Sequence, residues 1–546
     1  MKKLVLCNLL LLCTLSLFAQ SKSVKNVIVM IPDGTSTSLI SLARWYQTYF
    51  DPSNSTLNMD PYFCGLVRTN SSDAPIGDSA PTTSCYMTGQ PTQTGFVSTY
   101  PKQTDHDLVP IDATKAYQPL ATILEAAKQV NGMSTGLVFT CEFPHATPAD
   151  CAAHTYQRGS YATIAPQMVH NNVDVVIGGG TQYLSANDRQ YLKDQGYSIF
   201  LDDLNGMRQC TKAPFWALFC PGSMPYDVER DASRYPSLAE MTRKAITSLQ
   251  DNANGFFLMV EGSKVDWAAH NNDAVGAIRD FLAFDAACKE ALDFAQKDGQ
   301  TLVVILPDHG NSAMTIGSYA CSGGYDRLSL EQIIKPIASY KLSLDSMSRL
   351  MKAVDTTQWP ALFKTHYDYD VQSAEISYLY TASDYSKSQL PKEKKAGLSL
   401  DKMLSQVLYG KTCIGFTTYG HTGENVFLAC YQPNGDRLTG CRTNIEVNEY
   451  ICHQLGLDGK LSQLTEDIYA DHHEVFKDYQ TTIDSLDKNH YRLTVKYKKT
   501  TLVADSYTNY VTVNGRRHEL SSVMVYMPIN KTFYLPKRLD QYLFLK

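Results

Sequence analysis

The stretch VKNVIVMIPDG, residues 24–34, contains a short apolar run rich in β-branched residues that ends directly at Pro32-Asp33-Gly34. Such a run is typical of a strand buried on both faces of a sheet. Similar runs lie at residues 136–140, 173–177, 256–260 and 302–306, with amphipathic segments such as 120–130 and 272–295 between them. The alternation predicts an α/β fold, with a largely parallel central β-sheet flanked by helices on both faces.

Polar residues follow three of these predicted strands directly. Asp33 follows the first, Glu261 the fourth, and Asp308 with His309 the fifth. Ligands of open α/β sheets bind outside the carboxyl ends of the strands, so we expect these side chains to share one crevice. A single aspartate at such a position is usually a turn or helix cap, but three such ends, one with Asp-His, favour a shared metal site.

The segment EGSKVDWAAH, residues 261–270, places Asp266 and His270 four residues apart. On a helix, side chains with this spacing lie on the same face and can hold one cation together. In isolation the pair would be an ordinary surface Asp-His pair. Its position just after Glu261 favours the metal-binding interpretation.

Three further residues each have a structural and a functional interpretation. Thr147, followed by Pro148, predicts a helix start, but a hydroxyl at the rim of a crevice also suits a hard cation such as Mg²⁺. Arg158 is either solvated or offers its planar fork to a phosphate. His421, in the Gly-flanked turn YGHTGENV, would ordinarily be a loop histidine.

The segment IGDSAPTTSCYMTG, residues 76–89, leaves two roles open for Ser79. Asp78 and Ser79 stand where a helix might start, and both residue types are preferred helix N-caps because their oxygens accept orphan backbone N–H bonds. The alternative is that Ser79 is a nucleophile. The local sequence allows both.

Composition limits the classes of function. The chain has 546 residues, of which 44% are hydrophobic and 19% charged, as in a globular protein. Its net charge is −6, its pI is near 6.1, and it has no basic stripe to follow a nucleic-acid backbone. Nucleic acid is therefore excluded as a specific partner.

The N-terminus has the pattern of a secretion signal. Lys2 and Lys3 precede an apolar run over residues 4–18 and a small-residue exit at 19–21. This pattern predicts a cleaved signal peptide over residues 1–20 and a periplasmic or extracellular protein without a membrane span. Export permits disulfides, and Cys210/Cys220 and Cys430/Cys441 are close enough to close small loops, but spacing does not fix the pairing.

Taken in order, the polar motifs resemble those of the alkaline phosphatase family. They are IPDGTS around Asp33, DSA around Ser79, HATP followed by Arg158, VEG with Asp266 and His270, PDHGN around Asp308, and GHTGENV around His421. The resemblance runs from about residue 24 to about residue 425. Each motif is weak alone, whereas the ordered set is specific.

The resemblance implies two Zn²⁺ and one Mg²⁺ per subunit. The first zinc would be held by Asp266, His270 and His421, and the second by Asp33, Asp308 and His309. The magnesium would share Asp33 with Thr147 and Glu261. His145 matches a family position near the magnesium, which implies an outer-shell role. Because family members are commonly homodimers, a homodimer is also implied.

The implied activity is that of a secreted, metal-dependent phosphomonoesterase acting on small phosphate monoesters. Ser79 would coordinate the second zinc and form a phosphoserine intermediate, which answers the question of its role in favour of a nucleophile. Arg158 would hold two non-bridging phosphate oxygens, and Asp78 would orient Arg158 or a metal ligand.

Two departures from the family pattern keep alternatives open. Pro81-Thr82-Thr83 replaces a run of very small residues, and Trp267 replaces a basic or acidic residue that bonds phosphate through water, so we place Trp267 in the outer shell. Residues 79–83 also resemble the sulfatase pattern, which is Cys or Ser at the first position, Pro at the third and Arg at the fifth. They match it except at the fifth position, where this chain has Thr83. The alternatives are a sulfatase or phosphodiesterase of the same superfamily, or a non-catalytic metal-binding surface protein.

The chain also extends beyond the resemblance. The 111 residues between His309 and His421 (421 − 309 − 1) predict an inserted lid or crown-like subdomain over residues 310–415, within a catalytic domain spanning 21–475. From residue 476 to 546, alternating segments such as YRLTVKY and NYVTV predict a C-terminal β-rich extension, with a hairpin turn at Asn514-Gly515.

Overall fold

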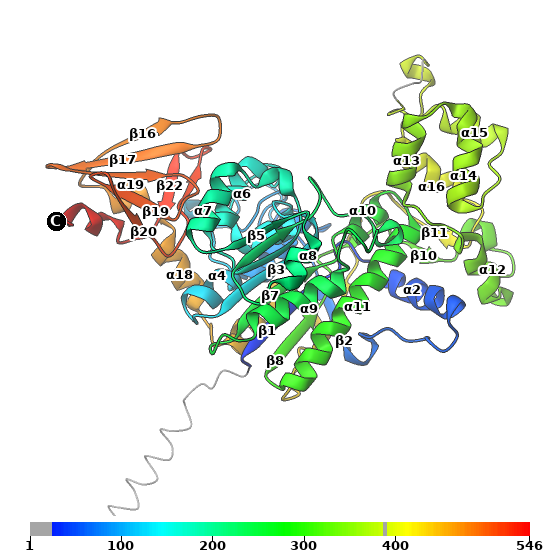
Figure 1. Cartoon of the computed structure of the whole chain (residues 1–546), viewed down its shortest axis with the longest axis horizontal. Coiled ribbons are helices and arrows are strands. Elements are labelled where there is room, and N and C mark those ends of the chain that lie inside the picture. Colours follow the sequence, from blue (N-terminus) through cyan, green and yellow to red (C-terminus); the bar gives the residue numbers. More distant parts are fainter. Residues whose placement is uncertain (1–23, 386–389, 546) are drawn as a thin grey trace, which may run out of the picture.

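The structure is a computed structural model that describes residues 24–385 and 390–545. The predicted signal peptide, residues 1–20, lies outside the described residues. The molecule is elongated (Figure 1), with an α/β body in the middle, the C-terminal strands at one end and a group of helices at the other. No helix in the described residues has both the length and the apolarity needed to cross a membrane.

A ten-stranded sheet forms the centre of the body and confirms the predicted α/β class. Every pairing in it is parallel except the two made by β13, which runs against its neighbours β2 and β8. In spatial order the strands are β14 (Gly440–Thr443), β2 (Phe63–Arg68), β13 (Val426–Tyr431), β8 (Thr301–Ile305), β1 (Asn26–Ile31), β7 (Phe256–Glu261), β3 (Ser134–Glu142), β4 (Val175–Gly179), β6 (Phe215–Leu218) and β5 (Ser198–Leu201).

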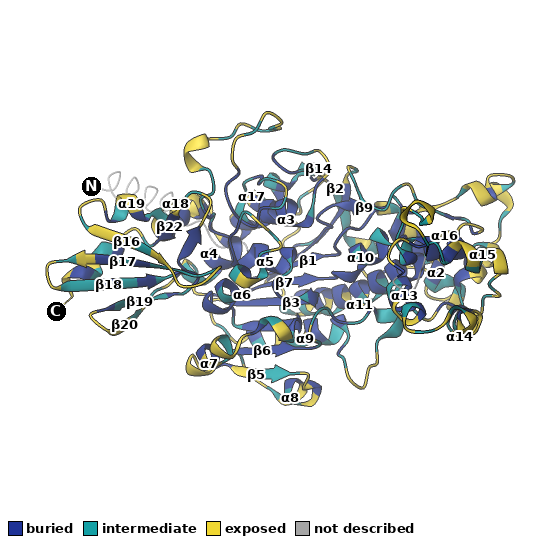
Figure 2. Cartoon of the chain, turned by 90° about the horizontal axis from the view of Figure 1, so that it is seen from above, coloured by how far each residue is buried: buried dark blue, intermediate teal, exposed yellow. Residues whose placement is uncertain are grey.

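The central strands are buried on both faces (Figure 2), which explains their unbroken apolar runs. In β1, Ile28 and Met30 pack into one core, whereas Val27, Val29 and Ile31 pack into the other. Helices on the first face are α2 (Thr37–Phe50), α8 (Leu204–Gln209), α9 (Leu238–Leu249), α10 (Lys264–His270) and α11 (Ala274–Asp298).

The second face is covered by helices from two parts of the chain, residues 79–194 and 444–468. They are α3 (Ser79–Thr88), α4 (Ile123–Gln129), α5 (Ala146–Ala152), α6 (Tyr161–His170), α7 (Ala186–Asp194), α17 (Asn444–Leu455) and α18 (Lys460–Ile468). The predicted helical segments 120–130 and 272–295 correspond to α4 and α11. Helices on both faces therefore bury the sheet as the sequence predicts.

The segment between residues 310 and 422 leaves and re-enters the body through two short antiparallel ribbons. In one, β9 (Gly310–Asn311) pairs with β12 (His421–Thr422); in the other, β10 (Thr315–Ile316) pairs with β11 (Ile414–Gly415). Among the residues described there, five α-helices lie between the ribbons: α12 (Leu330–Ile334), α13 (Leu344–Ala353), α14 (Trp359–Tyr367), α15 (Ser373–Leu379) and α16 (Leu400–Tyr409). The ribbons bring His421 back beside His309, although 111 residues separate them (421 − 309 − 1).

The C-terminal residues form two antiparallel sheets, as predicted in kind. One contains β16 (Gln480–Ser485), β17 (Tyr491–Tyr497), β18 (Thr500–Asp505), β19 (Tyr510–Val513) and β20 (Arg516–Glu519). The other contains β15 (Ala470–Asp471), β22 (Thr532–Leu535) and β21 (Val525–Met527). Asn514 and Gly515 connect β19 to β20 with φ of 50° and 82°, the positive values that this type of hairpin turn requires. The exact domain boundaries stay a prediction.

No cysteine in the described part of the chain forms a disulfide. All twelve in the described residues are free thiols, so neither Cys210 with Cys220 nor Cys430 with Cys441 forms a disulfide. Cys430 lies buried in β13, whereas Cys441 is exposed in β14, and β2 separates these two strands.

Candidate active site

The strand order explains why the predicted carboxylates meet. Strands β8, β1 and β7 are neighbours, and Ile31 at the end of β1 lies opposite Glu261 at the end of β7. Asp33 follows β1 and Asp308 follows β8, so these carboxylates come to the same edge of the sheet. Asp33, Glu261, Asp308 and His309 are completely buried.

Ser79 is the first residue of α3, and Asp78 is the residue that precedes the helix. The Asp78 side chain makes no capping hydrogen bond to the helix. The Ser79 side chain is 2% exposed, and its Oγ lies 3.2 Å from Nε2 of His309 and 3.4 Å from Oδ1 of Asp33. Ser79 therefore points into the cluster of ligand-type residues, and the capping interpretation does not describe its contacts.

Arg158 reaches the same crevice. Its guanidinium donates one hydrogen bond to Asp78 Oδ1 and another to Nε2 of His145, at 3.3 Å. Burial is the largest single effect and opposes the charged form, but Asp78, with the charges of Asp33 and Asp150, outweighs it and raises the pKa of Arg158 above its ordinary value. Burial raises the pKa of Asp78, but Arg158 outweighs this effect and lowers the pKa below its ordinary value. The guanidinium is thus fixed and charged, as phosphate binding requires.

One group of ligand atoms consists of Asp266, His270 and His421. Nε2 of His270 lies 3.0 Å from Nε2 of His421, and each lies 3.5 Å from a carboxylate oxygen of Asp266. The other ring nitrogens are held by backbone carbonyls: His270 donates to Tyr419 at 2.8 Å, and His421 to Gly77 at 2.8 Å. Fixing Nδ1 in this way directs Nε2 inward, the usual arrangement around a metal.

A second group contains Asp33, Asp308 and His309, whose ligand atoms all lie within 4.8 Å of one another. His309 is also within this distance of Asp266 and His421, so the two groups adjoin. Desolvation and then the charge of Asp308 raise the pKa of Asp33 well above its ordinary value. Several carboxylates buried close together are costly when ionised, and a cation between them would offset that cost.

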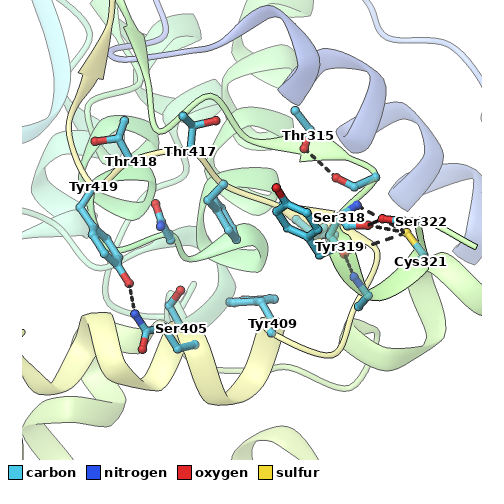
Figure 3. Close-up of a pocket in the computed structure, with 18 of the residues that line it drawn as sticks. Thr315, Ser318, Tyr319, Cys321, Ser322, Ser405, Tyr409, Thr417, Thr418 and Tyr419 are labelled. Atoms are coloured by element: carbon cyan, nitrogen blue, oxygen red, sulfur yellow. Dashed lines mark hydrogen bonds between the residues drawn. The ribbon is translucent and has the colours of Figure 1, made fainter.

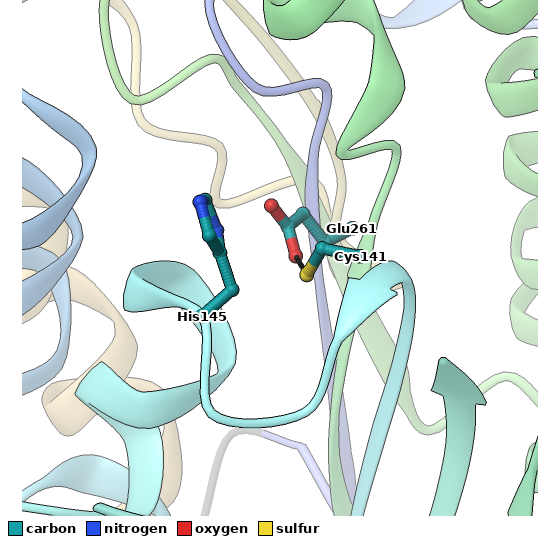
Figure 4. A group of neighbouring side chains, drawn as sticks. All are labelled: Cys141, His145 and Glu261. Atoms are coloured by element: carbon teal, nitrogen blue, oxygen red, sulfur yellow. Dashed lines mark hydrogen bonds between the residues drawn. The ribbon is translucent and has the colours of Figure 1, made fainter. Parts of the chain in front are cut away.

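A third group lies at the end of β3 and the start of α5. Figure 4 shows Cys141, His145 and Glu261 facing one another, and their ligand atoms lie within 4.8 Å. Within the described residues, the Thr147 hydroxyl, Glu261 Oε1 and His145 Nδ1 are buried without a hydrogen bond of normal geometry. Unsatisfied oxygens of this kind are what a hard cation would coordinate.

The predicted helix start at Thr147 is wrong by two residues. Helix α5 begins at Ala146, and His145 is the residue that precedes it. Thr147 therefore lies within the first turn, where its hydroxyl is not needed as a cap. The sequence could not settle this, because Thr-Pro fits a helix start in either register.

Trp267 lies at the edge of the site, beside the ring of His145, with ring centroids 5.6 Å apart. The buried ammonium of Lys264 lies 4.0 Å from the centroid of the Trp267 ring. Desolvation lowers the pKa of Lys264 to about 8. Trp267 is thus packed against His145 on one side and a cation on another.

Two residues at the site were missed by sequence reasoning. Cys141 donates from its thiol to Glu261 Oε2 at 3.3 Å, and Asn311 donates from Nδ2 to Asp266 Oδ1 at 2.7 Å. Each orients a carboxylate of the ligand groups. The available signals were the placement of Cys141 four residues before His145 and of Asn311 two residues after His309.

Comparisons with known proteins agree with this geometry. A model of the alkaline phosphatase family matches residues 24–457. The chain belongs to the alkaline phosphatase family. It is 32% identical over 455 residues to alkaline phosphatase 3 of Bacillus subtilis (strain 168), covering 80% of this chain and 90% of that protein. Alkaline phosphatase 4 of the same organism is 32% identical over 436 residues, covering 78% of this chain and 87% of that protein.

Solved alkaline phosphatases share the fold. The cold-active enzyme from the psychrophile Shewanella sp. superposes with a TM-score of 0.66 at 27% identity, covering 79% of this chain and 99% of that one. The Thermus thermophilus enzyme gives a TM-score of 0.69 at 23% identity, covering 80% and 92%. As a member of the alkaline phosphatase family the chain is a phosphatase, and the non-catalytic alternative is set aside.

Proposed function

We propose that this alkaline phosphatase is a secreted, metal-dependent phosphomonoesterase that works through a phosphoserine on Ser79. The observation that carries the proposal is the position of Ser79 Oγ, buried 3.2 Å from His309 and 3.4 Å from Asp33, in the crevice that Arg158 also reaches. A serine capping a helix would not need such neighbours.

The three groups of side chains suit three cations by their chemistry. Imidazole and carboxylate donors around Asp266 and around Asp308 suit Zn²⁺, whereas the oxygens of Asp33, Thr147 and Glu261 suit Mg²⁺. Burial raises the pKa of the Cys141 thiol well above its ordinary value, so Cys141 acts as a hydrogen-bond donor to Glu261. When bound, the cations would supply Lewis-acid chemistry, favouring the serine alkoxide and the negative charge on the departing alcohol.

The residues of the chain divide the remaining work. Ser79 Oγ bonds to phosphorus as the ester bond to the alcohol breaks, and water later breaks the bond between Oγ and phosphorus. Arg158, braced by Asp78 and His145, holds two non-bridging oxygens. Helix α3, ten residues long, directs its N-terminal amides toward the same anion.

The assignment extends to location and assembly. The predicted signal peptide would deliver the enzyme to the periplasm or outside the cell, and a homodimer is proposed from family resemblance.

The sulfatase alternative rests on Pro81, which is buried within the first turn of α3. The proposed substrates are small phosphate monoesters.

Trapping the intermediate tests the proposal. Incubating the metal-loaded enzyme with an aryl phosphate at acidic pH slows dephosphorylation, so mass spectrometry should find phosphate on the tryptic peptide containing Ser79. Ser79→Ala should lose the adduct and about 10³-fold or more of the turnover while still binding metals. If Ser79→Ala kept the wild-type rate, Ser79 would have only a structural role. If aryl sulfate were turned over faster than aryl phosphate, the sulfatase alternative would be favoured.

A further inference from the structure

A large cavity adjoins the group formed by Asp266, His270 and His421, and none of the roles above uses it. Its volume is about 840 Å³, within the range of about 300–1,000 Å³ in which small-molecule sites fall. The walls come from the segment after β10, from α16 and from the segment after β11 (Figure 3). Tyr319, Tyr409 and Tyr419 are among the side chains that line it.

The cavity shares backbone with two predicted metal ligands. Asn272, which lines it, lies two residues after His270, and Tyr419, which also lines it, lies two residues before His421. The carbonyl of Tyr419 accepts the hydrogen bond from His270 Nδ1 at 2.8 Å. The cavity therefore lies behind the His270 ring, on the side of Nδ1, one hydrogen bond away from the group that the proposed mechanism assigns to the departing alcohol.

The walls are aromatic and uncharged. Of the described residues that line the cavity, none is Asp, Glu, Lys, Arg or His, and five are aromatic: Tyr319, Tyr325, Tyr409, Phe416 and Tyr419. Phe416 meets Tyr409 edge to face, with ring centroids 5.9 Å apart and planes at 65°. The Tyr319 side chain is fully exposed and free to pack on an entering group.

Polar groups are present but are mainly hydroxyls and amides. Gln406 donates to the Tyr419 hydroxyl at 2.9 Å, and the Tyr409 hydroxyl donates to Asp273 at 2.9 Å, which fixes both rings. Ser322, Ser405, Thr417 and Thr418 also line the cavity. Such walls favour a flat, neutral ring that carries hydrogen-bonding groups, and they offer no cationic side chain to pair with an anion.

We propose that this cavity binds the alcohol part of the phosphate monoester, and that it selects neutral, ring-bearing alcohols of the nucleoside or aryl class. The inference rests on the proposed function, because it takes the phosphoryl group to lie at Ser79 and the leaving oxygen to lie beside His270 and His421. The ring then packs among Phe416, Tyr419 and Tyr319, so that binding energy from a remote part of the substrate orients the ester.

The test compares two esters on the metal-loaded, full-length enzyme. The ratio of kcat/KM for adenosine 5′-monophosphate to kcat/KM for glycerol phosphate should fall about tenfold in Phe416→Leu and in Tyr319→Ala, the size expected for the loss of one stacking contact. Phe50→Ala, which removes an exposed aromatic ring of α2 outside the cavity, should leave the ratio unchanged. Since Tyr319 is fully exposed, its replacement separates ligand contact from folding.

Adenosine alone provides a second measurement that does not need catalysis. It should bind by calorimetry and compete with the ester, with weaker binding in both cavity variants. An unchanged ratio in both variants, or adenosine that binds without competing, would overturn the assignment. So would a clear preference for choline phosphate, which would make the rings a cage for a cation. If no ester is hydrolysed although adenosine binds in the cavity, the proposed function fails instead.

Discussion

Two groups of aspartate and histidine in this molecule look alike as residue lists but differ in structure. One lies at the carboxyl edge of the central sheet. The other consists of Asp471, the last residue of β15, and His472 and His473, the first two residues of the short helix α19 (His472–Val475), with ligand atoms also within 4.8 Å. In the second group Asp471 accepts from the backbone amide of His473 at 2.8 Å, and His472 Nδ1 accepts from the amide of Phe533 at 3.2 Å.

The difference is in what the polar atoms already do. The Asp471 group caps a helix and joins β22, and the side chain of His473 is 60% exposed. At the sheet edge, Thr147 and Glu261 are completely buried and leave oxygen atoms without a normal hydrogen bond in the described residues. Ligand-type spacing is therefore insufficient to identify a metal site, whereas burial combined with unsatisfied oxygens points to one.

Metal removal should give the largest effect and should separate the two groups. We expect exhaustive chelation to abolish hydrolysis of an aryl phosphate, and Zn²⁺ with Mg²⁺ to restore it, since the buried carboxylates and histidines need cations to bind an anion. Elemental analysis should find about three ions per chain, a number that Asp471→Ala does not change. Full activity after complete metal removal would contradict the site assignment.

Paired histidine substitutions test the same difference between the two groups. His421→Ala should lower kcat/KM by about 100-fold or more and remove chiefly the first zinc, because it deletes one of three protein ligands. His309→Ala should remove chiefly the second. His473→Ala is the matched control and should change neither activity nor metal content. Equal metal loss from His421→Ala and His473→Ala would show that the two groups are not different in kind.

A paired arginine substitution has a smaller expected effect. Arg158→Lys keeps the charge but loses the fork, so kcat/KM should fall by about 10- to 100-fold. Arg492 in the C-terminal sheet also forms a two-pronged ion pair, with Asp505 at 2.6 and 2.9 Å. Arg492→Lys should leave kcat/KM unchanged. A similar loss in both variants would mean that Arg158 acts through folding and not through the phosphate.

Much of the fold follows from local sequence. The predicted strands at residues 24–31, 136–140, 173–177, 256–260 and 302–306 correspond to β1, β3, β4, β7 and β8, although β4 begins two residues later than predicted, at Val175. Short apolar runs rich in β-branched residues are consistent with buried strands. Asp266 and His270 share α10, as their spacing of four predicts. Asn514 and Gly515 form the predicted turn because they tolerate positive φ.

The features of the site that the sequence did not predict depend on contacts between segments far apart in the chain. Cys141 and Asn311 join the site only because β3 lies beside β7 and because β9 pairs with β12. The aromatic cavity is formed by segments from both ends of the 111-residue interval between His309 and His421 (421 − 309 − 1), and no local pattern reveals that they meet. Without the resemblance to alkaline phosphatases, His421 would have remained a loop histidine.

The smallest expected effect concerns Asp273, a carboxylate that is buried like those of the crevice but fully bonded. It accepts from the amides of Gly276 at 3.0 Å and Leu344 at 2.8 Å and from the Tyr409 hydroxyl at 2.9 Å, which joins α11 to α13 and α16. Desolvation raises its pKa from 3.8 to about 6. Because the pKa is raised in the folded state, the stability that protonated Asp273 contributes is present below about pH 4 and is lost as the pH rises through about 6. That loss is about 3 kcal/mol, or a few degrees in Tm.

Asp273→Asn should therefore show a shallower loss of Tm than the wild type between pH 4.5 and pH 7, measured by calorimetry on both proteins in the same buffers. Taking the difference between the two proteins at each pH cancels the titration of groups that both share. Asp471→Asn is the control from the other group. Burial raises the pKa of Asp471, but His472 and the amide of His473 outweigh it and lower the pKa to about 2, so its stabilising contribution is lost only below this pH range. The Tm difference for Asp471→Asn should stay constant from pH 4.5 to pH 7. If the Tm difference for Asp273→Asn also stayed constant over this pH range, the burial of Asp273 would not raise its pKa, and Asp273 would behave like Asp471.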